Sequence, residues 1–223
     1  MSCIAHFFRP ACFLFLLGVV VVLTLGCSTP GYRVHPEFEQ RLSSINHPAL
    51  MPLDVKVFES LPGGMVVLRE DWTTIGKENL QNAVVKGFAE RNYTVRLLES
   101  DSSLDTELAE IQSLYKVVNK SIRLQSYGRV SASNGPEKFE YSIGSLESIL
   151  AKLNADAVIF VCALEKISSN KSMAVVNLAM ADSSGTIIWY SVEGVRDRHG
   201  LIKSSGAAEL VKNLMLTYPK VGG

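Results

Sequence analysis

The chain has no excess of charge of either sign. Its 223 residues contain 22 Lys and Arg and 22 Asp and Glu. Nucleic-acid binding requires a basic face that neutralises phosphates. The balanced charge therefore argues against a nucleic-acid partner, and it also argues against an electrostatic hold on anionic lipid through net charge.

A hydrophobic run long enough to span a membrane is also missing near the N-terminus. Residues Ala11 to Gly26 carry no charge, but sixteen residues of helix cover roughly 24 Å, less than the ~30 Å hydrocarbon core of a bilayer. The run follows MSCIAHFFRP, whose one fixed side-chain charge is Arg9, and it ends at a small residue. This is the arrangement of a secretory signal peptide, so we expect residues 1–26 to be removed.

The residues around Cys27, VVVVLTLGCSTP, indicate how the N-terminus left by cleavage is modified. Gly26 followed by Cys27 resembles the lipobox of bacterial lipoproteins, in which the cysteine is acylated and becomes the first residue. Thr24 and Leu25 depart from the usual pattern, which prefers leucine three positions before the cysteine and a small residue two before it. The resemblance implies that Cys27 carries palmitate-type acyl chains, and two or three such chains hold a protein stably on a membrane. Ser28 stands where an aspartate would resemble the inner-membrane retention signal, which favours the outer membrane, with the protein facing the periplasm.

Few cysteines remain for other purposes. Of four, Cys3 and Cys12 leave with the signal peptide and Cys27 takes lipid, so Cys162 in AVIFVCAL has no partner for an intramolecular disulfide. A catalytic thiol needs an accessible, electropositive setting and a base. We interpret Cys162 as a small buried hydrophobic residue instead.

Motifs of catalysis and of metal binding are missing. The sequence contains no G-x-S-x-G, no H-E-x-x-H, no P-loop and no G-x-G-x-x-G. We therefore predict a protein that is not an enzyme and holds neither a cofactor nor a metal. One alternative stays open: Asp71 and Trp72 lie where an α/β fold places ligands, so a lipid-anchored hydrolase or small-ligand-binding protein would use that end of the sheet.

The patterning predicts three units. After the signal peptide, residues 27–52 are rich in Pro, Ser, His and charge without a clear period, and we expect a lipidated flexible tether with a short helical turn at Phe38 and Leu42. Such a tether spans about 25–30 Å. Residues 53–219 are predicted to form a single periplasmic domain.

Alternating and continuous apolar runs predict the strands of this domain, at 54–59, 65–70, 93–98, 156–164, 171–182 and 185–194. A helix ending near Asn92 separates the second and third runs, which predicts a βαβ unit with parallel neighbouring strands. The expected fold class is α/β (α+β). A single mixed sheet of about five strands is flanked by helices and ends in a β-hairpin and a C-terminal helix.

A long helix is predicted from the apolar rhythm of Leu104, Leu108, Ile111, Tyr115, Val118 and Ile122. It either forms a seam for a partner helix or lies across its own sheet, and we favour the sheet because the pattern is short. Lys116, Lys120 and Arg123 follow another face. Such a face is most often only solvated, and the sharper alternative is a contact with an anionic headgroup or a glycan.

An overlong polar loop, 126–145, follows the helix. Long irregular loops often carry binding residues, and aromatic side chains are enriched at interface hot spots. We therefore expect Tyr127, Phe139 and Tyr141 to form an interaction surface.

The C-terminal third carries a family resemblance. NADAVIFV, the hairpin AMADSSGTIIWY and the terminal amphipathic helix resemble periplasmic lipoprotein domains of the curli-secretion and pellicle-polysaccharide group, whose fold is similar to the amino-terminal domain of TolB. The resemblance covers Met65 to Tyr218 and carries no catalytic residues. It implies a non-enzymatic module of envelope assembly, in secretion or surface-structure biogenesis, whose partner is an envelope protein or a second copy of the chain. The sequence lacks the transmembrane hairpins of a channel-forming member.

The first testable prediction concerns the anchor. In cells fed labelled palmitate, the wild type should incorporate label, whereas Cys27→Ser should stay unlabelled and accumulate as an uncleaved or soluble form, because acylation needs the thiol. A wild-type protein that is soluble, unlabelled and cleaved elsewhere would show that Cys27 is not the anchor.

Overall fold

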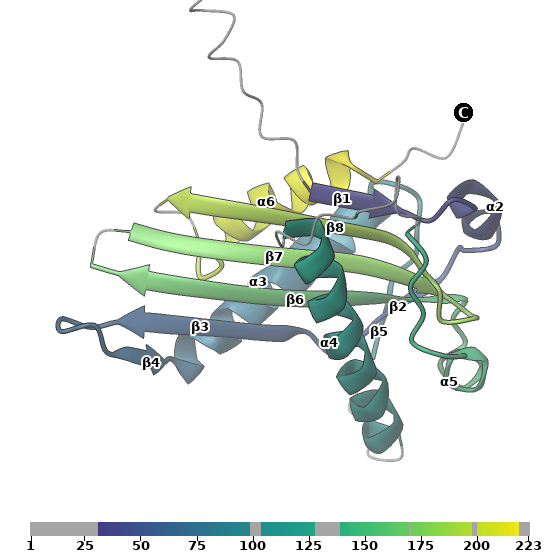
Figure 1. The fold of residues 1–223 in the computed structure, drawn as a ribbon, viewed down its shortest axis with the longest axis horizontal. Coiled ribbons are helices and arrows are strands. Elements are labelled where there is room, and N and C mark those ends of the chain that lie inside the picture. Colours follow the sequence, from purple (N-terminus) through teal and green to yellow (C-terminus); the bar gives the residue numbers. More distant parts are fainter. Residues whose placement is uncertain (1–30, 99–103, 128–138, 170, 198–199, 219–223) are drawn as a thin grey trace, which may run out of the picture.

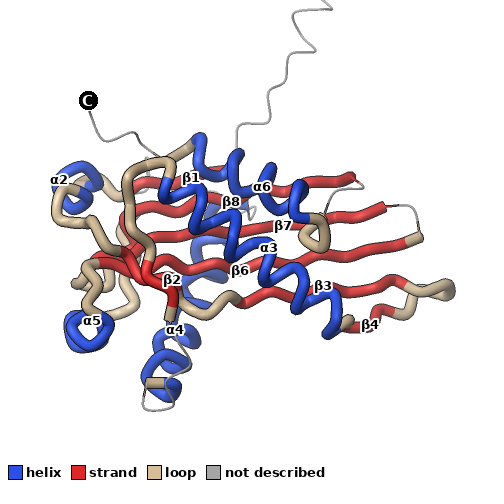
Figure 2. Tube along the Cα trace, turned by 180° about the vertical axis from the view of Figure 1, so that it is seen from behind, coloured by secondary structure: helices blue, strands red, loops and turns tan. Residues whose placement is uncertain are grey.

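The computed structural model describes residues 31–98, 104–127, 139–169, 171–197 and 200–218. These residues form one mixed sheet of eight strands with helices on both faces. Helices α3 (Glu70–Ala89) and α6 (Ser204–Leu216) cover one face, which Figure 2 shows from its own side. Helix α4 (Asp105–Tyr127) crosses the other face (Figure 1). The predicted fold class is confirmed, with more strands than the five expected. The predicted signal peptide, residues 1–26, and Cys27 lie outside the described residues.

Three long antiparallel strands form the middle of the sheet. Strands β6 (Ala157–Ser168), β7 (Lys171–Asp182) and β8 (Ile187–Asp197) follow one another in space as in sequence, and β1 (Gly31–Val34) pairs antiparallel with β8 at the outer edge. The first half of β6 is apolar and buried because helices cover both faces there. The predicted hairpin and the runs at 156–164, 171–182 and 185–194 are confirmed.

The opposite edge of β6 is shared by two short strands placed end to end. Strands β2 (Pro48–Leu50) and β3 (Asp54–Ser60) both run parallel to β6. Between them the Met51 amide donates a hydrogen bond to the Ile159 carbonyl at 3.0 Å. Strand β5 (Arg96–Leu97) is parallel to β2, and β4 (Val66–Leu68) is antiparallel to β3.

The predicted βαβ pairing of 65–70 with 93–98 is wrong. Gly63 and Gly64 both have φ of +87°, and their turn folds β4 back onto β3. The chain then passes through α3 and pairs β5 with β2 instead. The parallel partner of β5 is therefore β2, which lies in the segment predicted to be a flexible tether.

The prediction of a flexible tether through residue 52 is also wrong for residues 31–52. This segment supplies β1, helix α2 (Phe38–Leu42) and β2, and the side chains of Phe38 and Leu42 are buried, as expected for the predicted helical turn. Strand β2 is only three residues long and fits between β5 and β6, so its burial produces no periodic pattern. The carboxylate of Asp156 further fixes the segment by accepting hydrogen bonds from the amides of Asn46 and His47.

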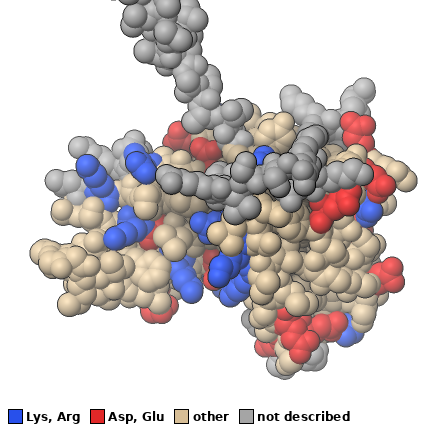
Figure 3. Space-filling view, in the orientation of Figure 1, with Lys and Arg blue, Asp and Glu red and all other residues tan. Residues whose placement is uncertain are grey.

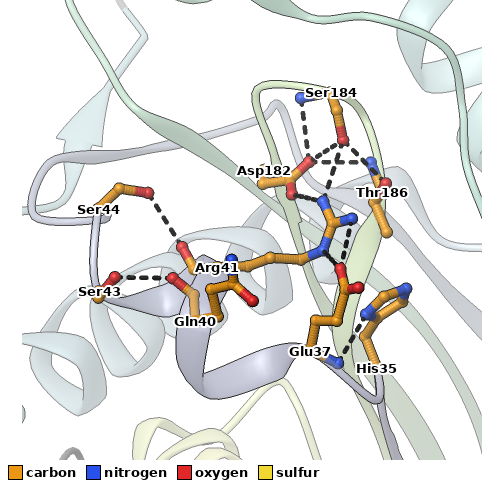
Figure 4. Close-up of polar contacts among 9 residues, drawn as sticks. All are labelled: His35, Glu37, Gln40, Arg41, Ser43, Ser44, Asp182, Ser184 and Thr186. Atoms are coloured by element: carbon orange, nitrogen blue, oxygen red, sulfur yellow. Dashed lines mark hydrogen bonds and ion pairs between the residues drawn. The ribbon is translucent and has the colours of Figure 1, made fainter.

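Asp182 joins this N-terminal segment to the β7–β8 hairpin (Figure 4). One carboxylate oxygen accepts hydrogen bonds from the amides of Ser184 and Thr186 and from the Ser184 hydroxyl, which shapes the turn. The other accepts one from the Arg41 guanidinium at 2.6 Å. Helix α2 is therefore held against the hairpin by a partly buried ion pair.

In the same turn, position 185 has no room for a side chain and is occupied by glycine. Its φ is +77°, and a Cβ there would lie 1.7 Å from the Gly144 carbonyl oxygen. The close approach lets the Ile143 amide donate to the Gly185 carbonyl and the Ile187 amide donate to the Tyr141 carbonyl. The end of the predicted 126–145 loop is thus bonded to the hairpin, whereas residues 128–138 lie outside the described part of the chain.

Two hydrophobic cores lie on opposite faces of the sheet. The first packs Trp189 of β8 edge-on to Tyr218, with ring centroids 4.9 Å apart, beneath α3 and α6. The second packs Tyr115 of α4 flat on Phe160 of β6 at 4.0 Å. Helix α4 therefore lies across its own sheet, which confirms the favoured interpretation. The described residues of both cores lie between 34 and 218, so every described element of the fold lies downstream of the predicted anchor.

The second prediction concerns Tyr115, whose buried hydroxyl has no hydrogen-bond partner among the described residues. Tyr115→Phe should leave the free energy of unfolding unchanged or raise it by about 1 kcal/mol, because no buried donor remains unsatisfied. Burial raises the pKa of Tyr115 well above its ordinary value. The unfolded chain then loses this proton first, so the free energy of unfolding falls as pH rises above about 10.

Denaturant titrations of the wild type and Tyr115→Phe, at neutral pH and above pH 10, measure both effects. The variant should lose less stability in alkali. Tyr32→Phe, at an exposed position, is the matched control and should leave the stability at neutral pH unchanged. A large destabilisation of Tyr115→Phe at neutral pH would show that the hydroxyl has a partner.

Candidate functional site

A groove of about 1020 Å³ lies between α4 and the half of the sheet that α4 leaves uncovered. Its lining comes from α4, β3, β6, β7, β8 and the first residue of β1. In Figure 3, Lys and Arg side chains gather around this hollow. We call it the basic groove. Its main lining side chains are Asp54, Lys56, Lys116, Asn119, Lys120, Arg123, Leu124, Cys162, Leu164, Met173, Val175, Asn177 and Val192.

The strand register builds the floor of the basic groove in rows. Cys162 lies beside Asp54 and Asn177, and two positions along the strands Leu164 lies beside Lys56 and Val175. Alternate residues of a strand point to the same face. Leu164 and Met173 remain 46% and 41% exposed, so the floor offers apolar surface that no described residue covers.

Helix α4 supplies one wall, and a buried polar network fixes it. The Tyr190 hydroxyl lies 2.8 Å from Asn119 Oδ1 on α4 and 3.2 Å from Asn177 Oδ1 on β7. Lys116 adds an ion pair to Asp54 at 3.2 Å. The wall is therefore held at a defined distance from the floor.

The remaining cations of the basic groove are available to a ligand. Lys56, Lys120 and Arg123 form no ion pair with any carboxylate in the part of the chain that the structure describes. Lys166 and Arg196 are exposed and continue the basic surface along β6 and β8, by the same strand alternation. The balanced net charge of the chain thus hides a local concentration of positive charge.

Cys162 lies half-buried in the floor of the groove, more exposed than the fully buried position expected from its sequence. Burial, followed by the nearby Asp54 carboxylate, raises the pKa of its thiol to about 12. The thiol is therefore protonated at neutral pH and is a poor nucleophile. The structural interpretation of Cys162 agrees with this environment.

Asp71 and Trp72 lie in the first turn of α3, away from the basic groove. The Arg69 guanidinium bonds the Asp71 carboxylate at 2.8 and 3.1 Å, bonds Glu59 at 2.6 Å, and lies 4.1 Å from the centre of the Trp72 ring. The hydrogen bond from Arg69 is the main reason that the pKa of Asp71 is lowered. The two predicted ligand residues are thus already engaged by a neighbouring side chain.

The aromatic residues proposed as an interaction surface are not equivalent. Phe139 is buried in the core beneath α4, so it is not a surface contact, and Tyr141 is half-buried beside it with ring centroids 5.2 Å apart. Tyr127 ends α4, and its side chain lies outside the described part. Phe139 is buried because the loop end bonds to the hairpin, a contact that local composition does not reveal.

The sequence offered the cationic face of α4 as an alternative contact for an anionic headgroup or a glycan, but it did not predict the groove. The available signal was the i, i+4, i+7 spacing of Lys116, Lys120 and Arg123, which placed them on one side of a helix but could not show what lies opposite. No group of three or more His, Cys, Asp and Glu side chains suited to a metal occurs among the described residues. None of the described helices is both long enough and apolar enough to cross a bilayer.

A second exposed surface lies at the edge formed by β4. Met65, Val66, Val67 and Leu68 are between 36% and 63% exposed. Strand β4 pairs with β3 on one side, and no other described strand pairs with it. An exposed apolar edge strand is a template on which another strand can pair.

The third prediction concerns Cys162 reactivity. In a chain that begins at Ser28, Cys162 is the single thiol. A pKa of about 12 in place of 9.0 leaves about one thousandth of the thiolate, so alkylation at pH 8 should be slower by about that factor in the native state than in denaturant. Asp54→Asn removes a carboxylate that raises this pKa and should speed the native reaction. Equal native and denatured rates would show a thiol with an unshifted pKa, and a faster native rate would show an activated thiol.

Comparisons with known proteins give partial structural overlaps. No family model and no curated protein matches the chain. Among solved structures, the LpoB C-terminal domain from Salmonella enterica overlaps 72% of this chain and 93% of that one, at 13% identity and a TM-score of 0.30. Lipoprotein GNA1162 from Neisseria meningitidis overlaps 68% and 80%, at 10% identity and a TM-score of 0.33. The LpoB C-terminal domain from Escherichia coli overlaps 72% and 93%, at 17% identity and a TM-score of 0.28. At these scores, residues and partners have to be argued from this chain itself.

Proposed function

We propose that the chain is a lipoprotein of a Gram-negative-type bacterial envelope, anchored through Cys27 on the periplasmic side of the outer membrane. Its domain is a non-enzymatic interaction and assembly module. One observation carries the proposal: β1 begins at Gly31, four residues after Cys27, and Gly31 itself lines the basic groove. The anchor and the candidate binding surface are therefore adjacent in the molecule.

The chemistry of the groove favours binding over catalysis. Its lining carries lysine and arginine side chains, and its thiol is protonated at neutral pH. Buried Glu165, on the opposite face of the sheet, accepts hydrogen bonds from the Ser172 hydroxyl and the Leu201 amide and is thus committed to structure. The alternative hydrolase at Asp71 would first have to displace Arg69 from that carboxylate.

The surface that we propose for a protein partner is the β4 edge. Its apolar side chains and unpaired side fit an extended segment of an envelope protein, which would add a strand to the sheet. Secretion or surface-structure biogenesis, the role implied by the family resemblance, involves such assemblies. A second copy of the chain is the competing occupant.

The fourth prediction tests this edge. Met65→Lys combined with Val67→Lys should reduce the recovery of crosslinked envelope partners about tenfold or more, because charge on an edge strand opposes strand pairing. Thermal melts should be unchanged, since both side chains are exposed. Leu216→Lys, at an apolar position of α6 that is 70% exposed, is the matched control and should keep the partner.

Capture that is equal for the edge variant and the control would contradict a docking role for β4. Recovery of a crosslinked homodimer alone would replace the envelope partner with a second copy. The palmitate experiment tests the anchor separately.

A further inference from the structure

We propose that the basic groove binds an anionic phospholipid of the same membrane that holds the Cys27 anchor. The phosphate contacts Lys120 and Arg123, and an acyl chain lies on the apolar floor around Leu164. The inference rests on the proposed function, because the anchor brings the groove to the membrane.

The length of chain between anchor and groove supports this occupant. Three residues separate Cys27 from Gly31, which lines the groove. Even fully extended, the four Cα-to-Cα steps from Cys27 to Gly31 span at most about 14 Å. The mouth of the groove is therefore kept within reach of the headgroup layer for as long as the protein is acylated.

The charges are complementary to a phosphate. Lys56, Lys120 and Arg123 have no carboxylate partner among the described residues, whereas the Asp54 carboxylate that also lines the groove is held by Lys116. Glu193, the other acidic residue of the lining, pairs with Val176 of the opposite core, so strand alternation directs its side chain away from the groove face. A Lys or Arg near an anionic membrane surface contributes favourably to binding, even when the net charge of the protein is zero.

The volume and the floor indicate an amphiphile rather than a free phosphate. A groove of about 1020 Å³ is at the upper end of the range of small-molecule sites, roughly 300–1,000 Å³. Its floor exposes Leu164 and Met173, which a phosphate alone would leave in water. An acyl chain would cover these side chains and gain the free energy of removing apolar surface from water.

The outer side of α4 is also suited to a bilayer. Leu114, Val117 and Leu124 are 52%, 70% and 57% exposed, and Leu124 reaches the groove. Apolar residues beside cations on one helix are typical of segments that lie in the membrane interface. The helix can thus rest on the headgroup layer while the groove receives a lipid.

The test uses the unacylated chain from Ser28, which contains every described helix and strand, so that its outcome is independent of the anchor. Flotation with phosphatidylcholine vesicles, with and without phosphatidylglycerol, measures binding. The wild type should bind the anionic vesicles and should release them as salt is raised. Lys120→Gln combined with Arg123→Gln should weaken binding about tenfold or more. Lys77→Gln combined with Lys86→Gln, the same charge change at exposed positions of α3 on the other face, should bind like the wild type.

A second arm separates a lipid from its headgroup. Leu164→Gln should weaken binding of a soluble short-chain phosphatidylglycerol severalfold, and it should leave the weaker binding of glycerol phosphate unchanged. Melting temperatures of all variants should match the wild type, because the substituted side chains are exposed.

Three outcomes would overturn the proposal. The first is equal binding of the wild type to neutral and anionic vesicles, and the second is equal binding by the two double variants. The third is displacement of the vesicles by an acidic peptide that binds the groove more tightly than the short-chain lipid does. The last would assign the groove to an acidic protein segment. If the wild type takes up no palmitate but still binds anionic vesicles, the proposed acylation of Cys27 is contradicted and the proposed lipid site is supported.

Discussion

A β-sheet with apolar residues on both faces must be covered on both faces. In this structure the helices cover one face more completely than the other, and the remaining features depend on that difference. Two helices, α3 and α6, lie over one face, whereas α4 crosses the other. The strands β6, β7 and β8 extend beyond α4. There the core beneath α4 ends, and the strands carry Lys, Arg and half-exposed apolar side chains. The basic groove is the space beside a helix that covers only half of its sheet.

The two faces of the sheet also differ in the charged side chains that they carry. On the covered face, the fully buried carboxylate of Glu165 accepts hydrogen bonds from a hydroxyl and a backbone amide. On the open face, the cations outnumber the carboxylates, and the network of Tyr190, Asn119 and Asn177 holds α4 in position. Cys162 lies at the boundary, where burial keeps its thiol protonated. The arrangement favours a surface that attracts anions over one that activates a nucleophile.

The sequence predicts the elements whose burial repeats along the chain. The continuous run of β6 and the heptad-like spacing of α4 are properties of consecutive residues, and both predictions agree with the structure. Strand β2 and Phe139 were missed because each is buried by a partner distant in sequence, β6 for one and the 182–187 turn region for the other. The groove was missed for a related reason. The spacing of Lys116, Lys120 and Arg123 defines a helix face, but the strands that lie opposite are brought there only by the register of β3, β6 and β7.

The placement of β1 and β2 has a consequence for the order of folding. Gly31 pairs with Val192 and Pro48 pairs with Ala157, so β1 and β2 can join the sheet only after β8 and β6 have been synthesised. Under the proposed function, in which Cys27 is acylated, this order leaves time for the N-terminus to be processed before the sheet closes on β1. Closure would then fix an already acylated end beside the groove.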